Sequence, residues 1–146
     1  VPAIELMRAS LPGMRARGFG RVVNITSAMV KAPLPDMGLS ASVRAALTAM
    51  SKAVAREAAA DGVTINNLLP ERIDSPRQRF MADHRAAADG ITREEAYARI
   101  ASTIPVGRLG TPEEFGDTCA FMCGMQAGYM TGQNIQLDGG SYPGLI

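Results

Sequence analysis

Residues 20–27 read Gly-Arg-Val-Val-Asn-Ile-Thr-Ser. This short, mostly apolar stretch with β-branched residues is typical of a strand that is buried on both faces of a parallel sheet. Two similar stretches follow it, Val-Thr-Ile-Asn-Asn-Leu-Leu at 63–69 and Gln-Asn-Ile-Gln-Leu at 133–137. We therefore predict three strands, at 21–26, 63–69 and 133–137.

Helical patterns lie before and between these strands. Apolar residues at three- and four-residue steps and Ser/Thr capping residues predict helices over residues 1–17, 38–60, 75–88, a short segment from 92, and 111–124. The long helix 38–60 has an apolar stripe that we expect to be buried: Leu39, Val43, Leu47, Met50 and Val54. Strands separated by helices imply right-handed crossovers and an α/β fold with a parallel sheet. Three strands are few for such a sheet, so we expect further strands upstream.

The composition excludes several classes of protein. The chain has 146 residues, which suits one domain, and 47% of them are hydrophobic, which argues against disorder. A net charge of +1 gives no basic surface for nucleic acid. No apolar run approaches the roughly 20 residues of a membrane span. The start has no Met and no signal-peptide pattern, so we expect a cytoplasmic protein of which this chain is the C-terminal part; a trimmed mature protein is the alternative.

The two cysteines and the single histidine predict no metal site. Cys119 and Cys123 lie four residues apart on one predicted helix, without further ligands nearby, so we expect buried thiols. His84 is expected on an exposed helix face.

Four segments resemble the short-chain dehydrogenase/reductase family. Residues 20–27 resemble its fifth strand and catalytic serine, and Ile-Asn-Asn-Leu-Leu-Pro at 65–70 resembles its sixth strand. Gly-Arg-Leu-Gly-Thr-Pro-Glu-Glu at 107–114 and the segment from Tyr129 to Gly140 resemble its C-terminal motifs. The order and spacing match, most closely the 3-oxoacyl-carrier-protein reductase branch. The resemblance implies a Rossmann-type doubly wound parallel sheet, with the fifth to seventh strands in this chain.

The same resemblance implies that residues 1–146 are the C-terminal portion of a single Rossmann domain. The family's glycine-rich dinucleotide loop follows its first strand, and no Gly-x-x-x-Gly-x-Gly occurs here. The N-terminal dinucleotide-binding part is therefore expected to be absent. The cofactor implied for the whole protein is NAD or NADP; the residues that decide between them lie in that part.

The catalytic positions implied by the family depart from its pattern. Ser27 matches the serine that hydrogen-bonds the carbonyl oxygen of the substrate. The family's tyrosine and lysine fall on Ser40 and Arg44, because Ser-Ala-Ser-Val-Arg-Ala-Ala-Leu at 40–47 aligns with Tyr-x-x-x-Lys-Ala-Ala-Leu. A serine hydroxyl is a much weaker acid than a phenol of pKa about 10. Arg44 keeps a positive charge that suits a ribose or phosphate, but it cannot release a proton.

Further cofactor-binding positions follow the second predicted strand. Pro70, Ile73 and Ser75 fall where the family contacts the nicotinamide, so the resemblance assigns them to the cofactor site. Glu71 replaces the family's glycine, and its carboxylate would repel a phosphate unless it turns away or pairs, for instance with Arg72.

Residues 74–104 correspond to the family's mobile substrate lid. Their arginines either attract an acidic substrate or form the solvated side of two helices whose Phe80, Met81 and Ile100 face inward. A second feature concerns assembly. Small residues line one side of the helix 38–60 at Ala41, Ala45, Ala49 and Ala53. The family pairs this helix with its counterpart in another subunit, so we expect a homodimer or homotetramer with a further contact near 139–146.

These features predict an NAD(P)-dependent oxidoreductase that reduces a carbonyl or oxidises an alcohol of a small molecule, with Ser27, Ser40 and Arg44 at the catalytic positions. The alternative is a catalytically impaired member of the family that acts as a binding or subunit-pairing module. Neither nucleic acid nor a membrane is an expected partner.

Overall fold

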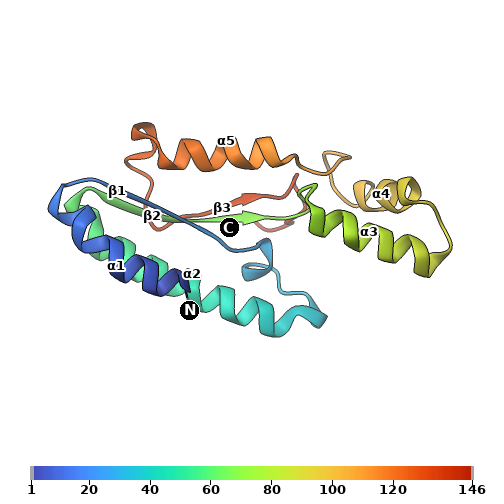
Figure 1. Ribbon diagram of the computed structural model, residues 1–146, viewed down its shortest axis with the longest axis horizontal. Helices are drawn as coiled ribbons and strands as arrows, with labels where there is room; N and C mark the ends of the chain where they lie inside the picture. Colours follow the sequence, from blue (N-terminus) through green and yellow to red (C-terminus); the bar gives the residue numbers. More distant parts are fainter. Residues whose placement is uncertain (1, 146) are drawn as a thin grey trace.

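The computed structural model describes residues 2–145 and has an α/β fold with a parallel sheet between two layers of helices (Figure 1). The strands are β1 (Gly20–Ile25), β2 (Val63–Pro70) and β3 (Asn134–Leu137), in that spatial order. Both neighbouring pairs are parallel. This arrangement confirms the predicted sheet and places each strand within one residue of its predicted bounds.

Helices cover both faces of the sheet. They are α1 (Pro2–Ala16), α2 (Gly38–Ala58), α3 (Pro76–Asp89), α4 (Arg93–Ala101) and α5 (Pro112–Cys123). Figure 1 shows α1 and α2 on one face, α5 on the other, and α3 with α4 beyond one end of the sheet. Short 3₁₀ turns, η1 (Ala28–Val30) and η2 (Pro35–Met37), occupy the loop between β1 and α2. Across residues 2–145 no helix combines the length and the apolar character that a membrane span requires.

The sequence around each lid and C-terminal helix explains where that helix begins. Ser75 caps α3, with Pro76 in its first turn, and Thr92 and Thr111 cap α4 and α5. In the last two helices a glutamate three residues later returns a hydrogen bond to the backbone of the cap. Each such cap stabilises a helix by about 1 kcal/mol. The start of each helix is therefore determined locally.

The main core lies between the sheet and the helices α1 and α2. Met7 of α1, Ala55 and Ala58 of α2, and Val63 and Ile65 of β2 are its buried members. A smaller cluster joins α3 to α4 through Ala82, Ala86 and Ala96.

The apolar stripe predicted for α2 is buried only in its second half. Leu47, Met50 and Val54 pack against the main core, whereas Leu39 and Val43 are 83% and 51% exposed. A helix buries only the length that another element covers, and in the described chain the sheet covers the second half of α2. Hydrophobic periodicity alone does not show where that cover ends.

Three asparagines, two of them buried, join the three strands at one level of the sheet. Asn24, Asn67 and Asn134 are register partners. Asn24 donates to Oδ1 of Asn67 (3.3 Å) and to Oγ of Ser51 on α2 (2.9 Å), and Asn67 donates to Oδ1 of Asn134 (2.9 Å). Asn24 and Asn67 are buried, and a buried amide without partners costs about 1–3 kcal/mol. This amide ladder therefore favours one register over its neighbours.

Replacing Asn67 by alanine removes the middle of the ladder: the Asn24 amide keeps only Ser51, and Oδ1 of Asn134 loses its donor. We expect the free energy of unfolding, measured by urea denaturation, to fall by about 2–3 kcal/mol. Gln126→Ala, a change at an exposed side chain, is the control and should stay within about 0.5 kcal/mol of the parent. A loss below 1 kcal/mol for Asn67→Ala would show that the ladder contributes little.

Candidate active site

A cavity of about 630 Å³ opens at the carboxyl ends of β1 and β2. Ser27, Pro70, Ile73 and Ser75 lie in its wall. Apolar side chains form much of the remaining wall, among them Ile25, Leu34, Met37 and Phe115. Parallel sheets bind ligands at this edge, and the volume lies in the usual range of small-molecule sites.

Ser27 enters the cavity because β1 ends directly before it. The Thr26 N–H donates to the carbonyl of Leu68 (2.9 Å), which continues the parallel pairing by one residue. Ser27 then caps η1, and its Oγ accepts from the Met29 N–H (3.2 Å). Within residues 2–145 the Ser27 O–H itself has no acceptor, so it remains available to donate to an oxygen in the cavity.

Backbone hydrogen bonds hold the segment after β2 on both sides. Glu71 N–H donates to the Leu137 carbonyl (2.9 Å), Gly110 N–H to the Arg72 carbonyl (3.1 Å), and Asp74 N–H to the Gly110 carbonyl (2.8 Å). A Cβ on Gly110 would lie 2.7 Å from Cδ1 of Ile73, so a larger residue at 110 would displace the end of the Ile73 side chain. Ile73 is thereby held in the cavity wall.

Arg72 is the only non-glycine residue with positive φ in the described part of the chain, at 55°. The left-handed conformation costs an L-residue with a Cβ about 1–2 kcal/mol. The surrounding backbone hydrogen bonds hold Arg72 in it nevertheless. Glu71 also lines the cavity, and its carboxylate makes no ion pair with Arg72 or any other described residue.

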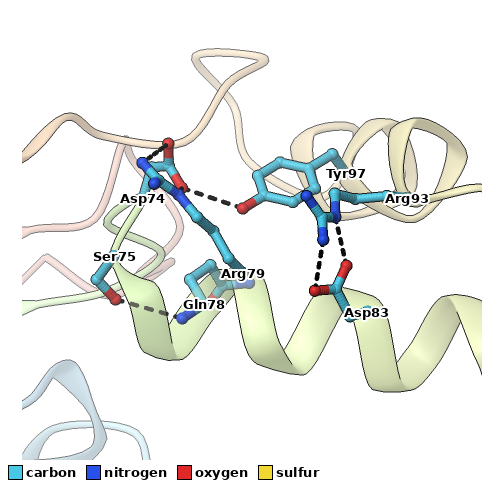
Figure 2. Close-up of polar contacts among 7 residues, drawn as sticks. All are labelled: Asp74, Ser75, Gln78, Arg79, Asp83, Arg93 and Tyr97. Atoms are coloured by element: carbon cyan, nitrogen blue, oxygen red, sulfur yellow. Dashed lines mark hydrogen bonds and ion pairs between the residues drawn. The ribbon is translucent and has the colours of Figure 1, made fainter.

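Ser75 links the cavity to α3. Its Oγ accepts from the Gln78 N–H (3.3 Å), as Figure 2 shows, while its residue lies in the cavity wall. The hydroxyl oxygen is thus used by the helix cap, and its proton stays available for a ligand.

Ser40 and Arg44 lie one turn apart near the start of α2 and bind each other. The Arg44 guanidinium donates to the Ser40 hydroxyl and to its carbonyl (3.2 Å). Neither residue lines the 630 Å³ cavity, to which the segment before α2 contributes Leu34 and Met37 instead. The structure brings together Ser27, Pro70, Ile73 and Ser75 and leaves Ser40 and Arg44 outside this group.

A polar cluster that sequence reasoning missed joins α3 to α4 next to the cavity (Figure 2). Asp74 accepts from the Tyr97 hydroxyl (3.0 Å) and from two nitrogens of Arg79 (3.1 and 3.2 Å), and Arg93 pairs with Asp83. The hydrogen bond from Arg79 lowers the pKa of Asp74, against a smaller opposing effect of burial. Burial, followed by the bond to Asp74, raises the pKa of Tyr97.

Tyr97 does not supply a phenol to the cavity that contains Ser27. It lines a separate cavity of about 330 Å³ with Asp74 and Gly110, and its hydroxyl is directed at Asp74 (Figure 2). Its raised pKa also makes it a weaker acid. The sequence contains no spacing motif for this contact, which depends on how α4 packs on α3.

Arg108 and Glu114 hold the loop that supports Ile73. Two guanidinium nitrogens of Arg108 bind the two carboxylate oxygens of Glu114 (2.9 and 2.6 Å), and Glu114 also accepts from the Thr111 N–H (2.8 Å). The hydrogen bonds from Arg108, which have the larger effect, and from Thr111 lower the pKa of the Glu114 carboxyl to about 2. The pair closes the 107–111 loop, from which Gly110 contacts Ile73.

The remaining candidate groups form no metal site within the described residues. Cys119 is half-buried, and burial raises the pKa of its thiol. Cys123 is exposed, so the prediction of a buried pair is wrong for this residue. Cys123 is the last residue of α5, where less of the helix is covered than at Cys119 one turn earlier. Phe80 and Met81 are likewise exposed, at 61% and 44%, rather than facing inward.

Known proteins resemble this chain over nearly its whole length. The family model described as enoyl-(acyl carrier protein) reductase matches residues 2–142. The NADPH-dependent reductase BacG of Bacillus subtilis is 33% identical over 141 residues, 97% of this chain and 54% of the relative. An acetoacetyl-CoA reductase of Rhizobium meliloti is 39% identical over 131 residues, 89% of this chain and 50% of the relative. The chain spans about half the length of these relatives.

Solved structures agree with the sequence comparison. The crystal structure of YwfH, an NADPH-dependent reductase involved in bacilysin biosynthesis, matches with a TM-score of 0.90 and 31% identity over 98% of this chain and 55% of that one. A variant of actinorhodin polyketide ketoreductase crystallised with NADPH gives a TM-score of 0.80 and 29% identity over 88% and 49%. The chain belongs to the short-chain dehydrogenase/reductase family, in its enoyl- and 3-oxoacyl-carrier-protein reductase-like branch.

The lowered pKa of Glu114 predicts a pH-dependent contribution to stability. Between its folded pKa of about 2 and its ordinary value of 4.5, the unfolded chain binds more protons than the folded one, so stability rises with pH across this window. The contribution is complete above pH 4.5 and is lost toward pH 2. Glu114→Gln keeps the helix cap but removes the charge. We expect the melting temperature of this variant to fall less steeply than that of the parent as the pH decreases from 5 to 2.5.

The matched control for this experiment is Glu113→Gln, a change at the neighbouring exposed carboxylate, which has no hydrogen-bond partner in the described chain. It should leave the slope unchanged. Equal slopes for the parent and Glu114→Gln would contradict the role of the Arg108–Glu114 pair.

Proposed function

We propose that the protein carrying this chain is a nicotinamide-dependent oxidoreductase that interconverts a carbonyl and an alcohol on a small molecule. The observation that carries this proposal is the position of Ser27, whose unpaired O–H lies in the wall of a cavity also lined by Pro70, Ile73 and Ser75. A hydroxyl donor beside an apolar wall suits a carbonyl oxygen that gains negative charge during reduction.

The cavity suits the nicotinamide end of NADPH. Pro70 and Ile73 offer apolar contacts for a flat ring, and the Ser75 hydroxyl proton is available for its amide group. The names of the relatives favour NADPH over NADH. When bound, the nicotinamide supplies or accepts the hydride. No glycine-rich dinucleotide loop occurs in this chain, so residues outside it would hold the adenosine half.

Residues of this chain would hold the carbonyl oxygen and exclude water, but they offer no good acid to protonate that oxygen. Ser27 would hold the carbonyl oxygen by donating its hydrogen bond, and the apolar wall would exclude water from the reacting centre. Protonation of that oxygen is the step in which this chain departs from its family. Ser40 is a poor acid, and the permanently charged Arg44 contributes only an electrostatic field.

The segment 74–104 is proposed as the substrate lid. Its helices α3 and α4 are joined to the cavity wall through Ser75 and Asp74, so a movement of α3 would change the wall directly.

A catalytically impaired family member that acts as a binding or pairing module is the second candidate. Two observations favour it: Ser40 and Arg44 bind each other outside the cavity, and Ala45, Ala49 and Ala53 of α2 are exposed rather than packed on the chain's own sheet. Such a surface lets another helix approach closely. We propose a homodimer or homotetramer through α1 and α2 with a further contact near 139–146; Val1 and Ile146 lie outside the described residues.

Reduction by the intact protein tests the leading proposal. We expect oxidation of NADPH in the presence of small ketones, followed by absorbance at 340 nm, and a kcat about 100-fold lower for Ser27→Ala, because removal of one such donor costs about 10²–10³. Thr118→Ala, a change outside the 630 Å³ cavity, is the control. Cofactor binding with no turnover on any ketone would favour the binding module.

Restoring the family's tyrosine and lysine tests whether the lack of a proton donor limits the reaction. The double variant Ser40→Tyr, Arg44→Lys should raise kcat by about 10²-fold or more, because a positioned general acid contributes about 10²–10⁴. Arg44→Lys alone and Ser42→Tyr, which places a phenol on the exposed side of the same helix, should not. No gain with intact cofactor binding would show that another acid already serves.

A further inference from the structure

The lid arginines differ in what they contact. Arg79, Arg85, Arg93 and Arg99 each pair with a carboxylate: Arg79 with Asp74, Arg85 and Arg99 with Asp89, and Arg93 with Asp83. The pairs of Arg93 and Arg99 join α4 to α3, whereas that of Arg85 lies within α3 and that of Arg79 joins α3 to the segment before it. Each of the four guanidinium groups therefore has a carboxylate partner. The fifth, Arg77, has no hydrogen bond or ion pair within residues 2–145.

Arg77 also occupies a different place, because it lies in the wall of the cavity that contains Ser27. It follows Pro76 in the first turn of α3, which the Ser75 cap holds against that wall. The four paired arginines do not line the cavity.

Arg72 is a second cation of the same kind on the same cavity. Its guanidinium has no partner in the described chain. Its left-handed backbone is held by the hydrogen bond from Gly110 to its carbonyl and by that from the preceding Glu71 to the end of β3. A strained residue in a ligand cavity indicates that its position is used. Glu71 contributes one negative charge to the wall against the two positive charges.

We propose that this cavity takes a carbonyl substrate that also carries an anionic group, held by Arg72 and Arg77 while its carbonyl faces Ser27. The inference rests on the proposed function for the carbonyl, whereas the anion is recognised by the two guanidinium groups alone. Arginine forks match the two oxygens of a carboxylate. Both arginines are exposed, so solvent screens each ion pair in part. The carbon skeleton of the substrate would lie against Ile25, Leu34 and Met37.

The same chemistry would suit a phosphate of the nucleotide cofactor. Glu71 favours the substrate, because its carboxylate opposes the pyrophosphate of the cofactor, which carries two negative charges in all, more than a singly charged carboxylate. The experiment distinguishes the substrate from the cofactor because it measures the binding of acetoacetate and of NADPH separately.

The test compares acetoacetate with its uncharged methyl ester by calorimetry on the intact protein, with and without NADPH. We expect acetoacetate to bind more tightly than the ester, and Arg72→Gln and Arg77→Gln each to raise its Kd about tenfold, as expected for a lost charged hydrogen bond. The Kd of the ester and of NADPH should stay unchanged. Glu71→Gln should tighten acetoacetate binding severalfold.

Two further variants keep the result interpretable. Arg72→Lys retains a charge at the strained position and should keep the preference for acetoacetate over the ester. Arg85→Gln removes an exposed lid arginine outside the cavity and should change neither ligand.

Two results would overturn the inference. Equal affinity for acetoacetate and its ester would show that the two guanidinium groups are solvated and do not bind the carboxylate. Weaker NADPH binding in the two glutamine variants, with acetoacetate unaffected, would assign the cations to the cofactor. Tight acetoacetate binding without turnover would support the anion site and count against the proposed reaction. Turnover of the ester alone would support the proposed reaction and count against the anion site.

Discussion

The register of the three parallel strands depends on a row of amides inside the sheet. Asn24, Asn67 and Asn134 meet across β1, β2 and β3, and Ser51 joins α2 to the same row. A shift of one strand by a residue would bury these groups without partners and turn the side chains to the opposite face. Because Ser27 and the segment after Pro70 follow their strands directly, the amide ladder also determines how the cavity wall is assembled.

A second constraint acts at the edge of the sheet. The segment from Glu71 to Asp74 continues beyond the end of β2, and its backbone is bound to Leu137 at the end of β3 and to Gly110 of the 107–111 loop. Gly110 in turn belongs to a loop closed by the Arg108–Glu114 pair. The position of Ile73 in the cavity therefore depends on residues about 35 positions later in the chain, although no side chain of that loop performs chemistry in the proposed reaction.

The fold was predictable from the sequence where local chemistry determines it, and much less so where packing does. The strands and the caps at Ser75, Thr92 and Thr111 follow from patterns within a few residues. The contact between Asp74 and Tyr97 does not, because it joins residues whose distance depends on the packing of two helices. The exposure of Leu39, Val43 and Cys123 has the same cause: periodicity identifies a face of a helix but not the length that is covered. For the site, Ser27, Pro70, Ile73 and Ser75 were located through family resemblance, whereas the placement of Ser40 and Arg44 outside the cavity required the side-chain positions.

The positive charge at the cavity has a different origin from the one that the family pattern implies. In the family pattern, the positive charge belongs to a lysine that lies beside a tyrosine on the long helix. Here one guanidinium nitrogen of Arg44 is hydrogen-bonded to Ser40 one turn earlier, and neither residue lines the cavity. The unpaired cations in the wall are instead Arg72, from the strained turn after β2, and Arg77, from the first turn of α3. In the proposed site, a charge in these positions would act on the far end of a ligand rather than on the acidity of a catalytic group. Under the proposed function, the residues at 40 and 44 would weaken proton transfer, whereas Arg72 and Arg77 would add recognition of charge.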